Sequence, residues 1–146
     1  MTPEKRVENK IKQTLDQMQA AWIKTHGESY TKKGIPDILV TYQGKSFQIE
    51  LKKPCGGVPT PIQIMTLAQY ARNGGYALIT NTCRVCEYIQ TLNPKLVHTT
   101  YFTDKRLARF NPCHKTPRQR QHIVDAARKL WQDYQDLGIV RIKWRS

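Results

Sequence analysis

Three residues in one short segment have side chains that could act together on a phosphodiester bond. Asp37 follows Pro36 at the start of a strand-like stretch, and Glu50 and Lys52 lie at the end of the next one. The Gln43-Gly44 pair between the two stretches suits a two-residue hairpin turn. In that register Asp37 lies directly opposite Glu50, with Cβ atoms about 4.5–5.5 Å apart. A three-residue loop would shift this pairing.

Two carboxylates at that distance have a clear electrostatic consequence. They repel by about 3 kcal/mol at an effective dielectric of about 20, whereas a divalent cation that prefers hard oxygen ligands would bind the pair. Lys52 lies on the same face as Glu50 and suits a water or a phosphate oxygen. The set predicts a Mg²⁺ or Mn²⁺ site that cleaves phosphodiester bonds. In the alternative, Asp37 only caps a strand end, and Glu50 and Lys52 form a solvated edge.

The surrounding pattern predicts the elements that position these residues. Residues 37–42 and 45–52 are strand-like. Because side chains alternate along a strand, Glu50 lies on one face, and the opposite face, formed by Phe47, Ile49 and Leu51, is expected to face the core. Thr60-Pro61-Ile62-Gln63 has the pattern of a helix start, and Gly74-Gly75 ends that helix before a strand over 76–80. Strand, helix and strand in this order imply a parallel pairing.

The remaining pattern completes an α/β fold. Apolar steps of three and four predict a first helix from Pro3 to about Trp22, which gives an α-β-β-α-β core with a mixed sheet flanked by helices. We also expect a helix over 84–91, a strand over 97–102, a helix from Thr116 whose apolar face reaches Leu137, and a strand over 139–144. Residues 1–92 form the expected core, and residues 93–146 a basic helical extension packed on it as one domain.

The charge of the chain indicates a polyanionic partner. Its 146 residues include 24 Lys and Arg against 11 Asp and Glu, a net charge of +13, which favours nucleic acid. Nine basic and two acidic residues fall within 95–129, so the extension is expected to bind DNA, the alternative being a solvated helical cap. The expected DNA-binding residues are Lys32, Lys33, Lys53, Lys105, Arg106, Arg109, Lys115, Arg118 and Arg120.

The sequence also predicts the compartment. No apolar run is long enough to span a membrane, and the first residues lack the apolar segment of a secretion signal. We therefore expect an intracellular protein, in the cytoplasm or nucleoid (or the host cytoplasm if the protein is viral), with no membrane partner and with reduced cysteines.

At its acidic residues the chain resembles the PD-(D/E)xK nuclease superfamily, through Pro36-Asp37 and Glu50-Leu51-Lys52. More narrowly, it is similar to the VRR-NUC family of virus-type replication-repair nucleases, which is related to Holliday-junction resolvases. The likeness covers about residues 4 to 92 and rests on motifs in the same order: ENKI, KGIPDILV, QIELKKP, TPIQ and NGGYALIT. It implies a restriction-endonuclease-like core. Cys55 and the roughly fifty residues beyond Asn93 depart from the family pattern.

The resemblance implies a role for each acidic residue. Asp37 and Glu50 would bind the metal, helped by the backbone carbonyl of Leu51. Glu8 in the first helix would reach the metal through a water. Alternatively, Glu8 is merely exposed, and Glu4 competes for its role.

The resemblance also implies catalytic roles for Lys52, which would orient the attacking water, and for Gln63, which would support Lys52 or the phosphate. The capping box explains Gln63 equally well. The function expected is a Mg²⁺- or Mn²⁺-dependent DNA endonuclease acting on branched or structured DNA. The alternative is a nuclease-fold protein that binds DNA without cleaving it, such as a recombination accessory. A homodimer is expected if a four-way junction is cut symmetrically.

The cysteines offer a rival metal site. Cys83 and Cys86, together with Cys113 and His114, would supply four ligands for a structural Zn²⁺. Cysteines three residues apart at a helix start are also ordinary packing residues, and the adjacent Cys113-His114 pair lacks the usual ligand spacing. Both interpretations remain open at this point.

Overall fold

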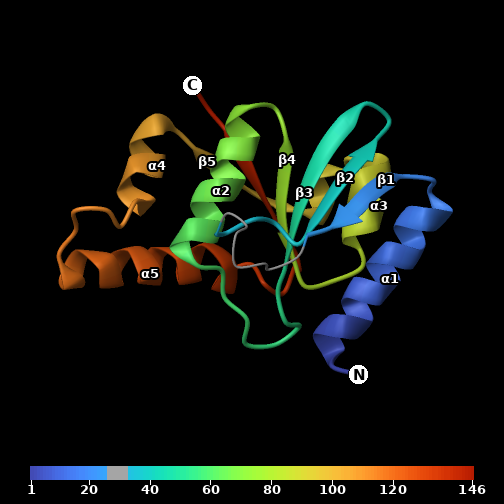
Figure 1. Cartoon of the computed structure of the whole chain (residues 1–146), viewed down its shortest axis with the longest axis horizontal. Coiled ribbons are helices and arrows are strands. Elements are labelled where there is room, and N and C mark those ends of the chain that lie inside the picture. Colours follow the sequence, from blue (N-terminus) through green and yellow to red (C-terminus); the bar gives the residue numbers. More distant parts are fainter. Residues whose placement is uncertain (26–32) are drawn as a thin grey trace.

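The computed structural model covers residues 1–146 and describes residues 1–25 and 33–146. Within these ranges six strands form one mixed sheet in the order β1-β2-β3-β4-β6-β5, and helices flank it (Figure 1). The predicted α/β class is confirmed. The strands are β1 (Ala21–Lys24), β2 (Ile38–Tyr42), β3 (Lys45–Leu51), β4 (Tyr76–Thr80), β5 (His98–Phe102) and β6 (Ile139–Trp144). The helices are α1 (Pro3–Gln17), α2 (Pro61–Arg72), α3 (Val85–Thr91), η1 (Pro94–Leu96), α4 (Asp104–Phe110) and α5 (Pro117–Gln132).

The β2–β3 hairpin has the predicted register. Gln43 and Gly44 have φ angles of 48° and 76°, and two positive φ angles in a two-residue turn are the geometry of a type I′ turn, which matches the twist of the strands. The pairs run from Tyr42 with Lys45 to Ile38 with Ile49. One further step along the same register sets Asp37 opposite Glu50.

The crossover from β3 to β4 also follows the prediction. Thr60 begins α2 with a capping box, in which its Oγ1 accepts from the Gln63 backbone N–H at 3.2 Å and its own N–H donates to Gln63 Oε1 at 2.9 Å. The helix returns the chain to β4, which pairs in parallel with β3. The capping box therefore fixes where α2 starts relative to the end of β3.

Apolar residues fill a separate core on each face of the sheet. Phe47 and Ile49 belong to the core that contacts α1 and α3, and Trp131 belongs to the core beneath α2, α4 and α5. We expected β3 to have a single core face, which is wrong. Gln48 and Glu50 are only 1% and 3% exposed, because the α2 crossover covers their face as well.

The C-terminal segment completes the sheet as well as adding helices. β6 pairs antiparallel with β4 and parallel with β5, so both predicted C-terminal strands are confirmed. α4, which the sequence pattern did not reveal, packs with α5 over the second core through Phe110 and Ile123. The division of the chain at residue 92 stays a prediction.

Two helices end earlier than predicted. α1 stops at Gln17, because Gln19 adopts a left-handed φ of 59°, and Trp22 instead pairs with Val40 in β1. α5 stops at Gln132, so Leu137 lies beyond it and is 38% exposed. Among the described helices, none combines the length and apolar character needed to cross a membrane.

Candidate active site

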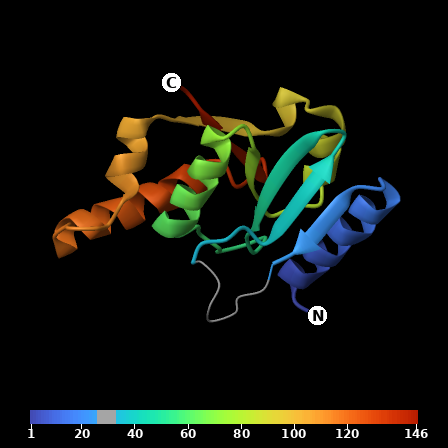
Figure 2. The same cartoon turned by 45° about the horizontal axis from the view of Figure 1, so that its top comes forward.

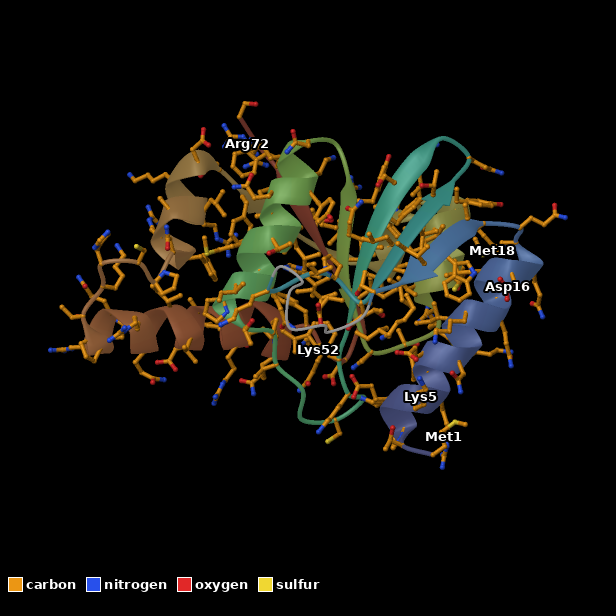
Figure 3. The ribbon with its side chains drawn as sticks, viewed as in Figure 1. Met1, Lys5, Asp16, Met18, Lys52 and Arg72 are labelled. Atoms are coloured by element: carbon orange, nitrogen blue, oxygen red, sulfur yellow. The ribbon has the colours of Figure 1, made fainter. Side chains whose placement is uncertain are left out.

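The predicted catalytic residues come together where β2 begins, β3 ends and α2 starts. Figure 3 labels Lys52, which directly follows β3, and its Nζ donates to Gln63 Oε1 in the first turn of α2. Gly34 lets the approaching chain lie against this turn, since its φ is 78° and a Cβ there would lie 2.6 Å from Ile62 Cγ2. Thr25 then fixes the entry to β2, donating from Oγ1 to Pro36 O at 2.6 Å and from its N–H to Asp37 O at 2.9 Å.

Asp37 is anchored on the backbone of the neighbouring strand. Its Oδ2 accepts a hydrogen bond of 2.7 Å from the Leu51 N–H at the end of β3. The Leu51 side chain belongs to the core beside α1 and α3. Asp37 therefore holds its carboxylate beside Glu50 through a bond that the hairpin register provides. The metal-binding role of the Leu51 carbonyl stays a prediction.

Glu50 carries the most strongly perturbed carboxyl group of the site. Burial, followed by the charge of Asp37, raises the pKa of Glu50 to about 8, and the nearby Lys52 ammonium only partly opposes this. Lys52 Nζ lies 3.4 Å from Glu50 Oε2, and Gln63 Nε2 donates to the same oxygen at 3.2 Å. In the absence of a cation, the site thus favours a protonated Glu50 at neutral pH.

Gln63 serves the helix cap and the site at the same time. Its Oε1 accepts from Lys52 Nζ at 3.0 Å and from the Thr60 N–H at 2.9 Å, while its Nε2 donates to Glu50. The two interpretations of Gln63 are therefore both satisfied by one side chain. Its amide holds the Lys52 ammonium next to Glu50, with the lysine side chain 12% exposed.

Glu8 is buried rather than exposed, and lysines surround it. Its carboxylate lies 2.6 Å from Lys5, 3.1 Å from Lys12 and 2.6 Å from Lys24. Burial raises the pKa of Glu8, but hydrogen bonds from Lys24, Lys5 and Lys12 together outweigh it and lower the pKa to about 2. Lys24 Nζ also lies 3.9 Å from Asp37 Oδ1, so this lysine links Glu8 to the carboxylate pair.

The sequence interpretation missed these three lysines. Lys5 and Lys12 stand three and four residues from Glu8, a spacing that brings side chains together on a helix, so their pairing could have been found. Lys24 reaches Glu8 only because β1 pairs with β2, and no local pattern indicates this contact.

The donor set of the site fits a hard divalent cation. Mg²⁺ is commonly bound by one or two carboxylates together with waters and substrate phosphates, and Asp37 and Glu50 supply such a pair. In residues 1–25 and 33–146, no three His, Cys, Asp or Glu side chains form a cluster that could hold a metal ion. Glu8 is therefore not joined to the pair as a direct third ligand.

The predicted DNA-binding residues are dispersed. Lys32 lies outside the described residues, and Lys33 and Lys53 are exposed. Arg106 is held by the fold, since its Nη1 donates to Thr100 Oγ1 at 2.7 Å and to Tyr101 O at 2.8 Å. The others occupy α4, α5 and their connection, at the end of the molecule opposite α1 (Figure 2): Lys105, Arg109, Lys115, Arg118 and Arg120.

The proposed zinc ligands do not come together. Cys86 is 2% exposed within the core beside α1, and burial raises the pKa of its thiol to about 12. Cys113 and His114 are exposed in the connection between α4 and α5, whereas Cys83 and Cys86 lie at the start of α3. Packing explains Cys86, and the described residues contain no metal-binding cluster.

Comparisons with known proteins concern the fold. No family model matches the chain, and a search of curated proteins gives no significant match. A solved VRR_NUC domain is similar in structure with 22% identity and a TM-score of 0.53, over 62% of this chain and 98% of the domain. The Holliday junction resolvase Hjc of Archaeoglobus fulgidus, also 22% identical, gives a TM-score of 0.44 over 53% of this chain and 67% of its own. The fold of this chain is therefore similar to that of a VRR_NUC domain, as the sequence resemblance led us to expect.

Proposed function

We propose that this protein is a nuclease that hydrolyses phosphodiester bonds in DNA with Mg²⁺ or Mn²⁺ as cofactor. The observation that carries the proposal is the Asp37–Glu50 pair, held side by side by the hairpin register and by the Leu51 N–H. A fold selected for stability alone has no use for a buried glutamate beside a second carboxylate, because each charge disfavours the other. The VRR_NUC-like fold supports the same proposal.

The residues of the chain have distinct tasks in this proposal. Asp37 and Glu50 would hold the cation, which supplies an acidified water and neutralises phosphate charge when bound. Lys52, fixed by Gln63 Oε1 at 3.0 Å, would donate to the phosphate and stabilise the negative charge that develops in the transition state. Gln63 would keep Lys52 oriented, and Glu8 would keep Lys24 beside Asp37.

The substrate preference is the finer part of the proposal. The sequence resemblance to resolvase-related nucleases favours branched or flapped DNA, and the net charge of +13 favours a polyanion. A homodimer belongs to the same proposal, because a symmetric cut of a four-way junction requires two sites. An intracellular location belongs to the same proposal.

The test is cleavage of labelled linear, flapped and four-way DNAs in Mg²⁺, Mn²⁺ or EDTA. Asp37→Asn is the site variant, and Asp136→Asn, an exposed acid beyond α5, is the matched control. We expect metal-dependent cleavage by the wild type and the control and none by Asp37→Asn. Binding without cleavage in any metal would favour the non-cleaving alternative, and an active Asp37→Asn protein would remove this residue from the site.

A further inference from the structure

Two hollows on the C-terminal side of the molecule join into one groove. Each has a volume of about 300 Å³, and they meet at Arg106 and Ala126. The groove runs along one side of α5, facing α4 and β5. Its lining residues, which define the α4–α5 groove, include Arg106, Arg109, Phe110, His122, Lys129 and Tyr134.

Within residues 1–25 and 33–146, the cations of the groove have no carboxylate partner. No ion pair among the described residues involves Arg106, Arg109 or Lys129. Burial, followed by the charge of Arg109, lowers the pKa of Arg106, so the half-buried Arg106 is repelled by the exposed Arg109. Among the described residues, Asp133 is the one acid that lines the groove, at the Lys129 end. An anion bound between the arginines would relieve this repulsion.

The fold holds Arg106 in place before any ligand arrives. Its Nη1 donates to Thr100 Oγ1 and to Tyr101 O, and its guanidinium lies 4.4 Å from the centroid of the Phe102 ring. A guanidinium fixed in this way loses little further entropy when it binds a phosphate. The groove is therefore pre-organised for an anion at its centre.

An aromatic platform lies at the Asp133 end of the groove. The rings of His98 and Tyr134 are stacked, with centroids 3.3 Å apart and planes inclined by 7°. Tyr134 remains 37% exposed, and burial lowers the pKa of His98, which favours its neutral form. Cations that follow a backbone, together with aromatic rings on which bases stack, are the features of single-strand binding sites.

The length of the groove suits a short strand segment. His122 on α5 and Asp133 directly after it are eleven residues apart, which corresponds to about 16 Å along the helix axis, the length of a short strand segment. Each hollow of about 300 Å³ has the size of a small-ligand pocket, which is room for single nucleotides. The cations and the exposed ring along this length thus suit a short single strand.

We propose that the α4–α5 groove binds a single-stranded segment of DNA, with phosphates on Arg106, Arg109 and Lys129 and a base on Tyr134. The inference deepens the proposed function, since the occupant would be an unpaired arm of the nuclease substrate. The groove lies on α4, β5 and α5, at the edge of the sheet opposite β1, and the carboxylate pair lies on β2 and β3. A substrate that occupies both sites must therefore present an unpaired strand at a distance from the bond that is cut.

The experiment measures binding without cleavage. Fluorescence anisotropy in EDTA would compare a labelled oligo-dT single strand with a duplex of equal length, as a function of salt. The charge variant is Arg109→Ala with Lys129→Ala, and its control is Lys10→Ala with Lys95→Ala, which removes the same charge from exposed positions elsewhere. The stacking variant is Tyr134→Ala, and its control is Tyr70→Ala, a tyrosine of equal exposure on α2.

We expect the charge variant to bind the single strand about tenfold more weakly and to lower the salt slope by about 1.4, from two contacts of about 0.7 each. Tyr134→Ala should weaken single-strand binding at least about fivefold. The control variants should bind the single strand with an affinity within about twofold of that expected from the loss of net charge alone. The same should hold for the affinity of every variant for the duplex. Thermal unfolding would confirm that each variant is folded.

Two results would overturn the inference. One is a groove variant that binds the single strand as its control does, and the other is an equal loss for single strand and duplex. Because the assay contains no metal, its outcome is independent of catalysis. If the protein never cleaves DNA but the groove variants bind the single strand more weakly, only the proposed nuclease activity is contradicted. If the protein cleaves DNA but the groove variants bind the single strand as their controls do, only the inference is contradicted.

Discussion

Replacing Glu50 by Gln should make the metal-free protein more stable, and increasingly so as the pH rises. The pKa of Glu50 is raised from 4.5 to about 8, by burial first and then by the charge of Asp37. For an acid with a raised pKa in the folded state, the stability is fully present below about pH 4.5 and is lost as the pH rises towards 8. The glutamine variant has no such loss, because its side chain does not ionise.

The magnitude follows from the same values. Between about pH 5 and about pH 8, ionisation of Glu50 should cost the folded wild type about 3 kcal/mol relative to the variant. For a chain of this size, that corresponds to about 6–12 °C in Tm. Glutamine keeps an oxygen that can accept from Gln63 Nε2, which donates to Glu50 Oε2 at 3.2 Å, so the geometry of the site should survive.

The assay is thermal unfolding in EDTA across this pH range, repeated with excess Mg²⁺. Glu87→Gln, an exposed acid on α3, is the control, and its Tm difference from the wild type should stay nearly constant with pH. Mg²⁺ should raise the Tm of the wild type and leave that of Glu50→Gln unchanged. A Tm difference between Glu50→Gln and the wild type that does not grow with pH would refute the argument that ionisation of Glu50 destabilises the metal-free fold.

Three further predictions concern other residues. Lys52→Ala should abolish cleavage yet keep DNA affinity within about threefold of the wild type, since one phosphate contact is a small part of binding by a protein with a net charge of +13. If a binding assay shows that affinity falls as far as activity, Lys52 is a binding residue. Glu8→Gln should lower the free energy of unfolding at pH 7 by about 2–3 kcal/mol. The reason is that the pKa of Glu8 is lowered to about 2, so its carboxylate contributes stability that is present above about pH 4.5 and lost as the pH falls towards 2. Denaturant midpoints at both ends of that range, with Glu4→Gln as control, would check this, and a loss that persists at low pH would contradict it. The purified protein should contain no stoichiometric zinc, and Cys113→Ser should leave its Tm unchanged, because Cys113 is exposed and Cys86 is packed in the core; one zinc per chain by elemental analysis would contradict this expectation.

The hairpin and the α2 crossover could be predicted because their signals are local. Gly44 tolerates the positive φ that a type I′ turn demands, and the turn alone fixes which residues face each other across the strands. Thr60 and Gln63 form a cap whose two hydrogen bonds lie within four residues. The Asp37–Glu50 pairing therefore needed no information from distant parts of the chain.

The rest of the site depends on contacts that are remote in sequence. Trp22 continues the apolar spacing of α1, so the sequence pattern extended the helix over it, although the chain leaves the helix at Gln17 and Trp22 pairs with Val40. That error also hid β1 and, with it, Lys24. The burial of Glu50 arises similarly from the position of α2 over the sheet, which an alternating strand pattern does not encode.

Lys24 and Lys52 offset the negative charge of the acids in the site. Glu8 lies 2.6 Å from Lys24, Lys24 lies 3.9 Å from Asp37, and Lys52 lies 3.4 Å from Glu50. Each carboxylate thus has a lysine on one side, and only Asp37 and Glu50 are left facing each other. When Glu50 ionises, the repulsion is confined to that pair. In the proposed nuclease, this contact is where a divalent cation would gain most by binding, because the lysines already neutralise the surrounding charge.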